Sequence, residues 1–460
     1  MTLNRPASVS GPAFRPFGLP AVAWIPRKVL PPSGLGWSPS WSVYQLGPVE
    51  FTTNLQPSSL KITTGATRYV ALSDGSNADN GSTWALAHKS LWDALNDAFT
   101  AGVAVTIYVE GSADPYNPTI YDYDNAWRSA LAVDANVIVV SDRTTLAPGY
   151  AISSTYMAPG GADLGTWSLV GGGTPNVYQA TLASAPNAVI DATVTSTHGA
   201  PTKLTLQASA ATVEANPGSY YHTAGVLYVR TADSRAPDSK LRALKAGVVN
   251  GHVNTSTVDC YVQGMTFEGG NARALFIQAA TTVTLVDCKA WHAQAAGIDL
   301  TSSTASGTYT ITCIRSGCYD NDADGFQYTA SGASATVKFA ELGCESNGNS
   351  GAGTDQGSTS HFTVGNTSVI GIRVGCSTKA NKTQGVADVG GTTVWEAGCR
   401  HVSEGSAVYC GDAGTTWLHG CVLTGNTTDI ATDSASGTVR VAGTAYKTTS
   451  GAGTVSVYSP

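Results

Sequence analysis

Three aspartates and an asparagine stand close together in the stretch IRSGCYDNDADGFQY, from Ile314 to Tyr328. Asp322 and Asp324 could serve as the paired carboxylates of glycoside hydrolysis, one protonated and one ionised. A lyase reaction on a uronate sugar needs instead a base such as histidine or lysine, together with a cation. The third interpretation is a solvated polar turn, because acidic side chains are usually exposed.

The same stretch begins like a calcium-binding loop. Its DNDADG run matches the start of the D-x-[DN]-x-[DN]-G-x₅-E pattern, but Tyr328 to Ser331 fill the region where the glutamate belongs. The sequence also has no C-x-x-C pair of the kind that binds zinc. We therefore expect neither a metal site nor a cofactor.

Further side chains that could contact a sugar follow along the chain. Asp355 and His361 belong to the glycine-rich segment ESNGNSGAGTDQGSTSHF, and we expect them to border a groove with the lysines that come after it. The catalytic candidates are Asp322, Asp324, Asp355 and His361, and the carbohydrate-binding candidates are Tyr121, Tyr123, Trp127, Lys379 and Lys382. The aromatic candidates could stack on sugar rings. The alternative is that they pack over the first coil, because aromatic side chains are mostly structural.

Composition places the chain among β-rich proteins. Its 460 residues suffice for two or three ordinary domains or for one repeat array. Only 12% are charged and 51 are glycine, which is typical of strands joined by tight turns. The net charge of −7 lacks the basic footprint of a nucleic-acid binder. We expect no membrane insertion, since no stretch approaches about 18 apolar residues, and no export signal, since prolines interrupt the apolar N-terminal piece.

Cysteines recur in a pattern that includes the acidic stretch. All nine lie between Cys260 and Cys421, and an odd number confined to one half of the chain is a poor disulfide framework. Six of them, separated by 30, 26, 32, 23 and 22 residues, mark successive repeats: Cys288, Cys318, Cys344, Cys376, Cys399 and Cys421. Phe267 takes this position in a preceding copy. Such repeats predict a solenoid with the cysteines stacked inside it.

Residues around each cysteine predict the two faces of a strand. The positions four and two before it, which include Trp395, are interpreted as inward. The position three before it is interpreted as outward, and it holds Arg315, Glu341, Arg373 and Glu396 in successive copies. Alternating charges on neighbouring strands predict a surface ion ladder with a structural role. Asn321 and Asn347, each three after a cysteine, predict an asparagine stack at a turn.

The chain divides into five predicted regions. They are an extended arm at 1–65, an N-terminal cap with the first coils at 66–164, an inserted β-module at 165–245, a parallel β-helix at 246–440 and C-terminal strands at 441–460. The aromatic-rich arm is interpreted as ordered against a partner, with packing on its own domain as the alternative. Ser82 could begin a helix that has Leu91, Leu95 and Phe99 on one face, ends at Gly102 and covers the open end of the solenoid.

The opening SDGSNADNGSTWALAHKSLWDALNDA, the strand VTIYVEG and coils such as GCYDNDADGFQY resemble the right-handed parallel β-helix, or pectate-lyase-like, superfamily. The resemblance covers about residues 70–150 and 246–440. It implies an all-β fold, a right-handed parallel β-helix solenoid with an N-terminal capping helix, an extended N-terminal arm and a small inserted β-module. The superfamily includes polysaccharide lyases, glycoside hydrolases, and bacteriophage tailspikes and tail fibres. The catalytic residue patterns of pectate lyases and polygalacturonases find no match here.

The resemblance implies a bacteriophage virion protein, a tailspike, tail fibre or related receptor-binding protein, that contacts host cell-surface polysaccharide as a homotrimer. Residues 1–65 would attach it to other virion proteins. The expected location is the virion, on the tail or another external surface, after synthesis in the host cytoplasm without a signal peptide. The alternatives are a polysaccharide depolymerase (lyase or glycoside hydrolase) that acts on capsule or lipopolysaccharide, and a non-enzymatic head or baseplate decoration protein.

Overall fold

The computed structural model describes residues 25–63, 65–71, 74–76, 78–111, 133–140, 150–153, 164–172, 174–238, 240–244, 251–253, 258–270, 273–278, 280–302, 306–331, 334–349, 356–362, 368–433 and 436–460. Within these ranges, side chains are described except at 150–153, 251–253, 302 and 356–362. None of the helices in this part of the chain is long and apolar enough to cross a membrane.

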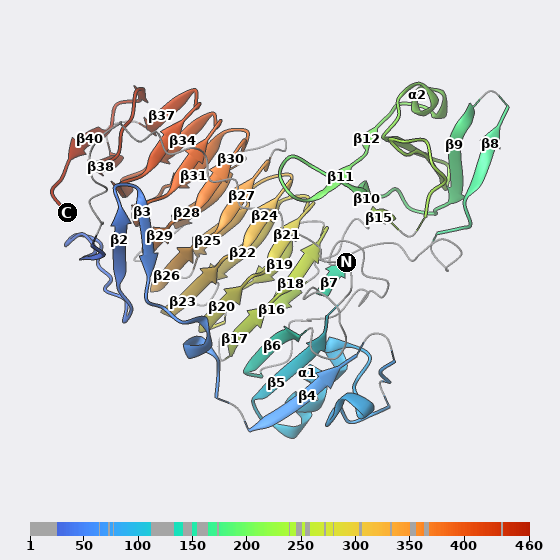
Figure 1. The fold of residues 1–460 in the computed structure, drawn as a ribbon, viewed down its shortest axis with the longest axis horizontal. Coiled ribbons are helices and arrows are strands. Elements are labelled where there is room, and N and C mark those ends of the chain that lie inside the picture. Colours follow the sequence, from blue (N-terminus) through green and yellow to red (C-terminus); the bar gives the residue numbers. More distant parts are fainter. Residues whose placement is uncertain are drawn as a thin grey trace.

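Most of the chain winds into a solenoid of three sheets, here called sheets 1, 2 and 3 in the order in which each coil passes through them (Figure 1). Sheet 1 contains β4 (Ala66–Val70), β5 (Val105–Glu110), β6 (Ala135–Val140), β17 (Asp259–Gln263), β20 (Thr282–Val286), β23 (Ser306–Ile314), β26 (Ser334–Leu342), β29 (Ser368–Val374), β32 (Thr393–Ala397), β35 (Thr415–His419), β38 (Thr438–Ala442) and β40 (Thr454–Val457). Sheet 2 contains β7 (Tyr150–Ser153), β18 (Met265–Glu268), β21 (Lys289–Trp291), β24 (Gly317–Tyr319), β27 (Glu345–Asn347), β30 (Ser377–Lys379), β33 (Arg400–Val402) and β36 (Val422–Thr424). Sheet 3 contains β16 (Gly251–Val253), β19 (Arg273–Ile277), β22 (Ala296–Ser302), β25 (Phe326–Ala330), β28 (Gln356–Phe362), β31 (Gln384–Asp388), β34 (Ser406–Cys410), β37 (Thr428–Thr432) and β39 (Thr449–Ser450).

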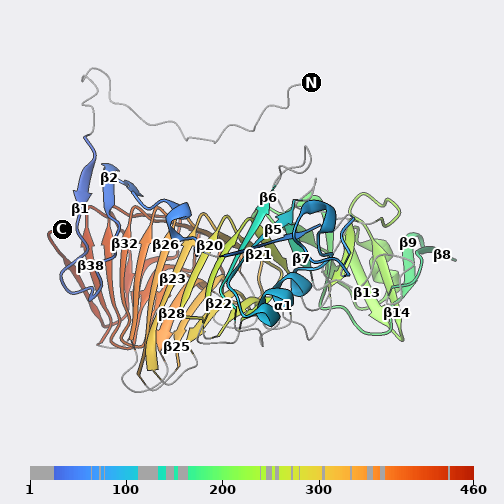
Figure 2. The same cartoon turned by 90° about the horizontal axis from the view of Figure 1, so that it is seen from below.

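Neighbouring strands within these sheets are parallel, and the coils stack along one axis (Figure 2). The apolar interior runs through the stack as one cluster that extends from the first coil to the last. This confirms the predicted fold class, an all-β parallel β-helix solenoid. The last strands of sheets 1 and 3, β40 and β39, come from the predicted C-terminal region and continue the stack.

Small buried side chains form one column where each coil passes from sheet 1 into sheet 2. Its members, aligned by the pairing of the sheet 2 strands, are Met265, Cys288, Ser316, Cys344, Cys376, Cys399 and Cys421. The Cys344 thiol donates to the Cys313 carbonyl at 3.3 Å, and the Cys399 thiol donates to the Arg373 carbonyl at 3.4 Å. The column therefore joins successive coils by hydrogen bonds as well as by packing.

Two members of the predicted column were wrong by two residues. Cys318 aligns with Ala290 of the preceding coil, so the column position of that coil belongs to Ser316. The register was misread because the Ser316 hydroxyl makes the same contact as a thiol and lies 3.3 Å from the Leu285 carbonyl. In the preceding coil, the pairing of β18 with β21 aligns Met265 with Cys288, so Met265 and not the expected Phe267 belongs to the column.

The predicted faces of the sheet 1 strands are inverted. Trp395, expected inside, belongs to a cluster on the outer face, whereas Glu341, Arg373 and Glu396, expected outside, point into the solenoid and are at most 3% exposed. The prediction was wrong because a turn residue with positive φ, such as Gly398 at 65°, separates each strand from the column cysteine. This residue resets the two-residue alternation, so the inward positions lie three and five residues before the cysteine.

The described part of the arm runs along the outer face of sheet 1 (Figure 1). It forms an antiparallel sheet and a short 3₁₀ helix: β1 (Arg27–Val29), β2 (Val43–Gly47), β3 (Glu50–Thr53) and η1 (Pro57–Leu60). Leu35 and Phe51 are buried in the same cluster as Trp395, and the Thr393 hydroxyl donates to the Leu35 carbonyl at 3.1 Å. This segment is therefore ordered against its own solenoid, which was the alternative interpretation. Residues 1–24 lie outside the described residues.

A helix covers the first coil, as expected, but its details differ from the prediction. Helix α1 (Leu91–Ala101) begins after Ser90, whose hydroxyl accepts from the Asp93 amide, and η2 (Trp84–Leu86) follows the predicted start at Ser82. Gly102 ends the helix at φ 66°, as predicted. The buried face is Leu91, Ala94, Leu95 and Ala98, and Phe99 is 42% exposed. Eight residues rotate a helix by about 80° beyond two full turns, which carries Phe99 off the core side.

The inserted module lies beside the solenoid with its own apolar core. Its strands form a five-stranded and a three-stranded sheet: β8 (Ser168–Gly171), β9 (Thr174–Thr181), β10 (Ala188–Thr195), β11 (Pro201–Lys203), β12 (Thr205–Leu206), β13 (Ser219–Thr223), β14 (Val226–Arg230) and β15 (Leu241–Leu244). Helix α2 (Ala210–Ala215) packs against β9, β13 and β14. The pairs are antiparallel except β12 with β13, which is parallel.

Candidate functional site

The acidic stretch forms a turn between sheets 2 and 3. Asp320 has a positive φ of 51°, so the chain bends directly after β24. Its three aspartates do not share one face: Asp324 is 9% exposed, and the side chain of Asp322 is 40% exposed. The stretch is therefore a polar turn, as one of the alternatives predicted, but it is only partly solvated because Asp324 is nearly buried.

Residues of the inserted module bind the first two aspartates of this turn. The Ser196 hydroxyl donates to Asp320 at 2.6 Å, and His198 Nδ1 lies 2.5 Å from the other oxygen of the same carboxylate. The Lys203 ammonium pairs with Asp322 at 2.5 Å. These contacts fix the module against the solenoid, so Asp322, a predicted catalytic residue, has a structural partner.

A buried ion pair extends this contact beneath the module. Arg242 of β15 and Glu268 of β18 are each 2% exposed, and the guanidinium Nε donates to the carboxylate at 2.9 Å. Trp291 donates its indole N–H to Glu268 at 3.0 Å and packs with Ala200 and Tyr319. The described residues of the module thus cover the outer face of sheet 2 over β18, β21 and β24 and reach Gly348 directly after β27, whereas Lys379 and Arg400 on later strands are exposed.

His292 sits at the centre of this interface. It is fully buried, has a positive φ of 62°, and its Nε2 lies 2.7 Å from the carbonyl oxygen of Pro201 in the module. Burial lowers the pKa of His292 to about 4, and the positive charge of Lys203 acts in the same direction. The imidazole is therefore neutral at neutral pH and donates from Nε2 to the carbonyl.

An internal ladder of amides supports the turns that carry the acidic stretch. The side-chain oxygen of Asn349 accepts from the Asn321 amide at 3.1 Å, and that of Asn381 accepts from the Asn349 amide at 3.0 Å. Glu404 continues the ladder and accepts from the Asn381 backbone. The predicted asparagine stack is present, but its second member is Asn349, because the expected Asn347 belongs to β27 and pairs with Tyr319.

Several predicted site residues lie outside the described part of the chain. Tyr121, Tyr123, Trp127 and Asp355 are among them. The backbone of His361 belongs to β28, opposite Thr329 of β25, and its side chain is not described. A groove that involves these residues stays a prediction.

Lys379 and Lys382 come together on the uncovered side of sheet 2. Lys379 is the last residue of β30, Lys382 follows in the turn to sheet 3, and both are exposed. Asp322 lies in the equivalent turn two coils earlier, at about 10 Å along the axis. The structure thus places two of the carbohydrate-binding candidates and one of the catalytic candidates along one side of the solenoid.

We call the uncovered outer surface of sheet 2 the open face. The middle residues of its short strands, such as Ser346 and Thr378, are buried, so their flanking residues point outward. The open face comprises Glu345, Asn347, Ser377, Lys379, Arg400, Val402, Val422 and Thr424. At one end, the Tyr319 hydroxyl donates to Glu345 at 3.2 Å beside the module. The face is therefore flat and mostly polar, with the module as a step at its end.

A separate groove of about 290 Å³ lies between the arm and the solenoid. Its lining residues are Phe51, Thr52, Thr53, Leu55, Pro57, Ile314, Arg315, Leu342, Gly343, Val374 and Gly375. Arg315, expected in an outward ladder, is instead a turn residue that pairs with Asp287 at 2.7 Å. Because three aliphatic side chains from successive coils form its floor, the groove offers few groups that could orient a sugar.

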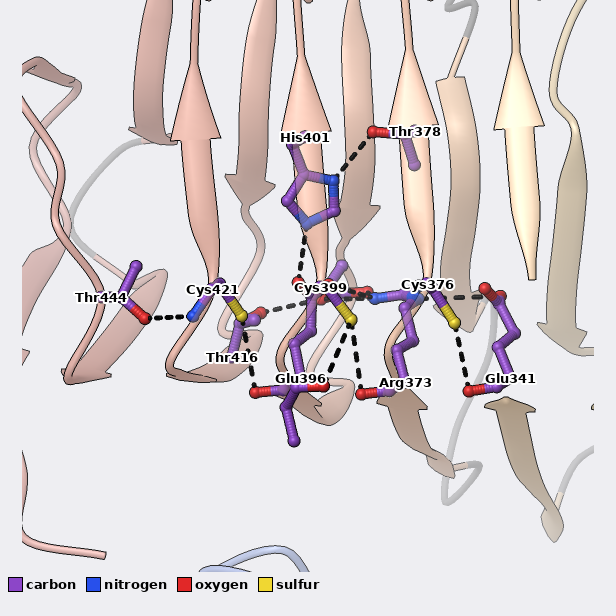
Figure 3. A network of polar contacts seen from close by, with 12 residues as sticks. Glu341, Arg373, Cys376, Thr378, Glu396, Cys399, His401, Thr416, Cys421 and Thr444 are labelled. Carbon is purple, nitrogen blue, oxygen red and sulfur yellow. Dashed lines mark hydrogen bonds and ion pairs between the residues drawn. The ribbon is translucent and has the colours of Figure 1, made fainter. Parts of the chain in front are cut away.

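Charged side chains of sheets 1 and 2 meet inside the solenoid (Figure 3), and Asp388 of sheet 3 joins them. The Arg373 Nη1 atom lies 3.0 Å from Asp388 and 3.1 Å from Glu396, while Glu341 lies 3.7 Å from its Nε. Burial alone would lower the pKa of Arg373, but the three carboxylates outweigh it and hold the pKa above its ordinary value. Arg373 therefore stays charged in the interior.

His401 connects this cluster to sheet 2. Its Nε2 lies 2.9 Å from Glu396, and its Nδ1 lies 2.8 Å from the Thr378 hydroxyl (Figure 3). Burial alone would raise the pKa of Glu396, but His401 and Arg373 hold it below its ordinary value. These side chains are at most 4% exposed. The cluster is thus part of the core and closed to a dissolved substrate.

Sequence reasoning missed the residues that join the module to the solenoid. Ser196, His198 and Lys203 lie 119 to 124 residues away from their partners in the sequence, and no periodic signal connects them. Arg400 was also missed, although a signal existed: it directly follows a column cysteine, at the position equivalent to Lys289 and Glu345. Period-two alternation beyond the cysteine places that position on the outer surface.

Comparisons with known proteins show likeness to solved structures only at a distance. No family model and no curated protein matches the sequence. A solved structure described as the complex structure of XylC with xylose superposes with a TM-score of 0.39 at 10% sequence identity, and the match covers 82% of this chain and 70% of that chain. A likeness at this level carries no argument about site or substrate.

Proposed function

We propose that this chain is a virion-borne β-helix of tailspike or tail-fibre type that holds host cell-surface polysaccharide against the open face of sheet 2. The observation that carries the proposal is the open face itself. Its strands repeat about every 4.8 Å and present hydroxyl and charged groups such as Ser377, Lys379 and Arg400. An extended glycan, which repeats hydroxyl groups along its length, is complementary to such a surface.

The module supports the proposal because it gives the face a boundary. Tyr319 and the module residue Ala200 are packed together, and Glu345 lies directly beyond Tyr319. A chain laid along sheet 2 from the C-terminal end would meet this step. Tyr319 itself is only 9% exposed, so the exposed Glu345 carboxylate is the group at this step that can accept from the hydroxyls of a sugar ring.

Thiol chemistry supports a virion protein. All nine cysteines are buried and free. Free thiols are typical of proteins made in a reducing compartment, and disulfides are common in exported proteins. A particle assembled in the host cytoplasm and released by lysis combines free thiols with an extracellular ligand. The homotrimer and attachment through residues 1–65 stay predictions, and residues 1–24 and 64 of that segment lie outside the described part of the chain.

The alternatives, depolymerase and decoration protein, rest on no specific feature of the described residues. Asp322 is bound by Lys203, and Asp324 is nearly buried. A reducing-end and unsaturated-uronate assay on any bound polysaccharide tests catalysis, with Asp322→Asn and Asp324→Asn as variants. If the unmodified protein releases fragments and neither variant does, the function is cleavage of the polysaccharide and not binding alone.

A steric block tests the binding face. Ser377→Trp places a large side chain in the middle of the open face, and Gln327→Trp places the same side chain on the outer face of sheet 3 as a matched control. We expect capsular or lipopolysaccharide preparations that bind the unmodified protein to bind Gln327→Trp equally and Ser377→Trp at least about tenfold more weakly. Equal binding by the two variants would remove the open face from consideration.

A further inference from the structure

We infer that the polysaccharide held by the open face is acidic; this inference rests on the proposed function and names its substrate class. The open face carries two exposed cations on neighbouring strands, Lys379 of β30 and Arg400 of β33, against a single carboxylate, Glu345. The exposed Lys382 follows in the next turn. A concentration of positive charge on one face of a chain with a net charge of −7 is complementary to an anionic ligand.

Arg400 differs from the other arginines in the described part of the chain. Most of those form an ion pair with a carboxylate, among them Arg68, Arg273 and Arg315. Arg27 donates to a glutamine, and the guanidinium of Arg440 lies over the ring of Trp417. Among the described residues, the guanidinium of Arg400 has neither a side-chain hydrogen bond, an ion pair nor a ring contact. Its five N–H donors are therefore available to a ligand.

The chemistry of the two cations suits a sugar acid. A guanidinium binds a carboxylate, sulfate or phosphate by two parallel hydrogen bonds, and an ammonium acts as a point charge beside it. Arg400 lies opposite Ser377, and Lys379 lies opposite Asn347, so each cation has a neutral polar neighbour on the adjacent strand. The acidic group of one sugar unit can pair with Arg400 while Ser377 binds its hydroxyls.

The charge extends toward the C-terminal end of the same sheet. A single bridge pairs Val422 of β36 with Ala445, and the exposed Lys447 follows two residues later. Anionic groups spaced along a glycan can therefore meet successive cations. Nucleic acid is the less suitable polyanion, because its binding is driven by many phosphate contacts and a strongly basic surface, and this chain is acidic overall.

Charge-removing variants test the substrate class. The probes are polygalacturonate and polysialic acid as acidic glycans, dextran as a neutral glycan, and single-stranded DNA as an anion that is not a sugar. We expect Arg400→Gln and Lys379→Gln each to weaken binding of an acidic glycan by about tenfold, the equivalent of one charge-assisted hydrogen bond. The affinity of Arg400→Lys for the acidic glycan should lie between that of Arg400→Gln and that of the unmodified protein. Lys28 is an exposed lysine on the arm, and Lys28→Gln should leave the affinity unchanged. Salt should weaken binding of the acidic glycan in the unmodified protein more than in Arg400→Gln.

The outcomes separate the inference from the proposed function. If Ser377→Trp blocks a neutral glycan that Arg400→Gln binds normally, the acidic class is overturned and the open face remains a glycan site. If single-stranded DNA binds as tightly as the acidic glycans and responds to the same variants, the face is a general anion site and the inference fails. If Ser377→Trp changes the binding of no glycan, the proposed function itself fails.

Discussion

Acid should loosen the contact between the module and the solenoid through one residue, His292. The ordinary pKa of histidine is 6.5, and that of buried His292 is about 4. Since the unfolded chain takes up the proton first, the free energy of unfolding should fall as the pH drops from 6.5 to about 4, with no further loss from this group below that range. A pKa lowered from 6.5 to about 4 corresponds to about 3 kcal/mol in the free energy of unfolding.

The groups around the imidazole determine this shift. Burial is the largest cause, and Lys203 adds to it, whereas the carboxylates of Asp320 and Glu268 act in the opposite direction. The Pro201 carbonyl, 2.7 Å from Nε2, also raises the pKa because it accepts from the protonated nitrogen, but burial outweighs it and the ring stays neutral. A positive charge there gains no buried partner that offsets its desolvation.

The matched variant is His292→Asn. Asparagine tolerates the positive φ of this position and carries an amide that can donate to Pro201, but it does not titrate. Urea unfolding followed by tryptophan fluorescence, in which Trp291 reports on the interface, gives the free energy at each pH. We expect the variant to be less stable near neutral pH because it is smaller, and to lose about 3 kcal/mol less than the unmodified protein on acidification. Equal losses in both proteins would refute the assignment of this pH dependence to His292.

Four further predictions concern the core. Arg373→Met should lower the free energy of unfolding by about 3–5 kcal/mol, because it leaves buried carboxylates without their cation. Arg315→Ala, in an exposed pair, should lower it by about 1 kcal/mol or less in the same urea titration. Equal losses would contradict the stabilising role of the interior cluster. Cys399→Ser should be more stable than Cys399→Ala, because the serine at position 316 already makes the same hydrogen bond to a carbonyl of the preceding coil. If thermal unfolding gives the reverse order, the Cys399 thiol contributes only apolar packing. Native thiols should resist an aromatic disulfide reagent until the chain unfolds, because all nine are buried; rapid labelling of the folded protein would disprove this. Asn349→Ala should cost about 1–3 kcal/mol in urea unfolding, since the Asn321 amide loses its acceptor, and a loss below that range would show that water replaces it.

The solenoid could be predicted because its signal is repeated. Each coil contains a strand, a turn glycine and a small buried residue, so six cysteines were enough to indicate a stack. The exact register could not be read from residue types. Ser316 makes the contact expected of a cysteine, and Cys318 lies two positions later on the same side of the chain, so both positions satisfied the pattern.

The inversion of the faces shows why alternation alone is insufficient. Counting back from the cysteine by two assumes a continuous strand, but the residue before it has positive φ, as in Gly343 and Gly375. A single turn residue exchanges inside and outside for the whole strand. The aromatic residues then lie under the arm, and the charged residues lie in the core. The sequence did contain a signal for such a turn, because a glycine directly precedes five of the six repeated cysteines.

The candidate site could be predicted only in part. Lys379 and Lys382 follow from the repeat, because equivalent positions of successive coils lie on one side of the solenoid. The binding of Asp320 by Ser196 and His198 depends on where a separate module docks, across more than 120 residues of sequence. Local pattern carries no information on such a contact, so an acidic turn with a structural partner was indistinguishable from a catalytic one.

The buried charges bear on how the coils find their order. Columns of cysteine and aliphatic residues are alike from coil to coil, so burial of apolar area changes little when a coil stacks on the wrong neighbour. Arg373 is matched by Glu341 of the preceding coil, Glu396 of the following coil and Asp388 across the interior. A slipped coil would leave this guanidinium without its carboxylates, at a cost of several kcal/mol. The cluster therefore selects one register of the coils. If an Arg373→Met protein kept a native near-UV circular dichroism spectrum, the apolar columns would be sufficient to select that register without the buried charges.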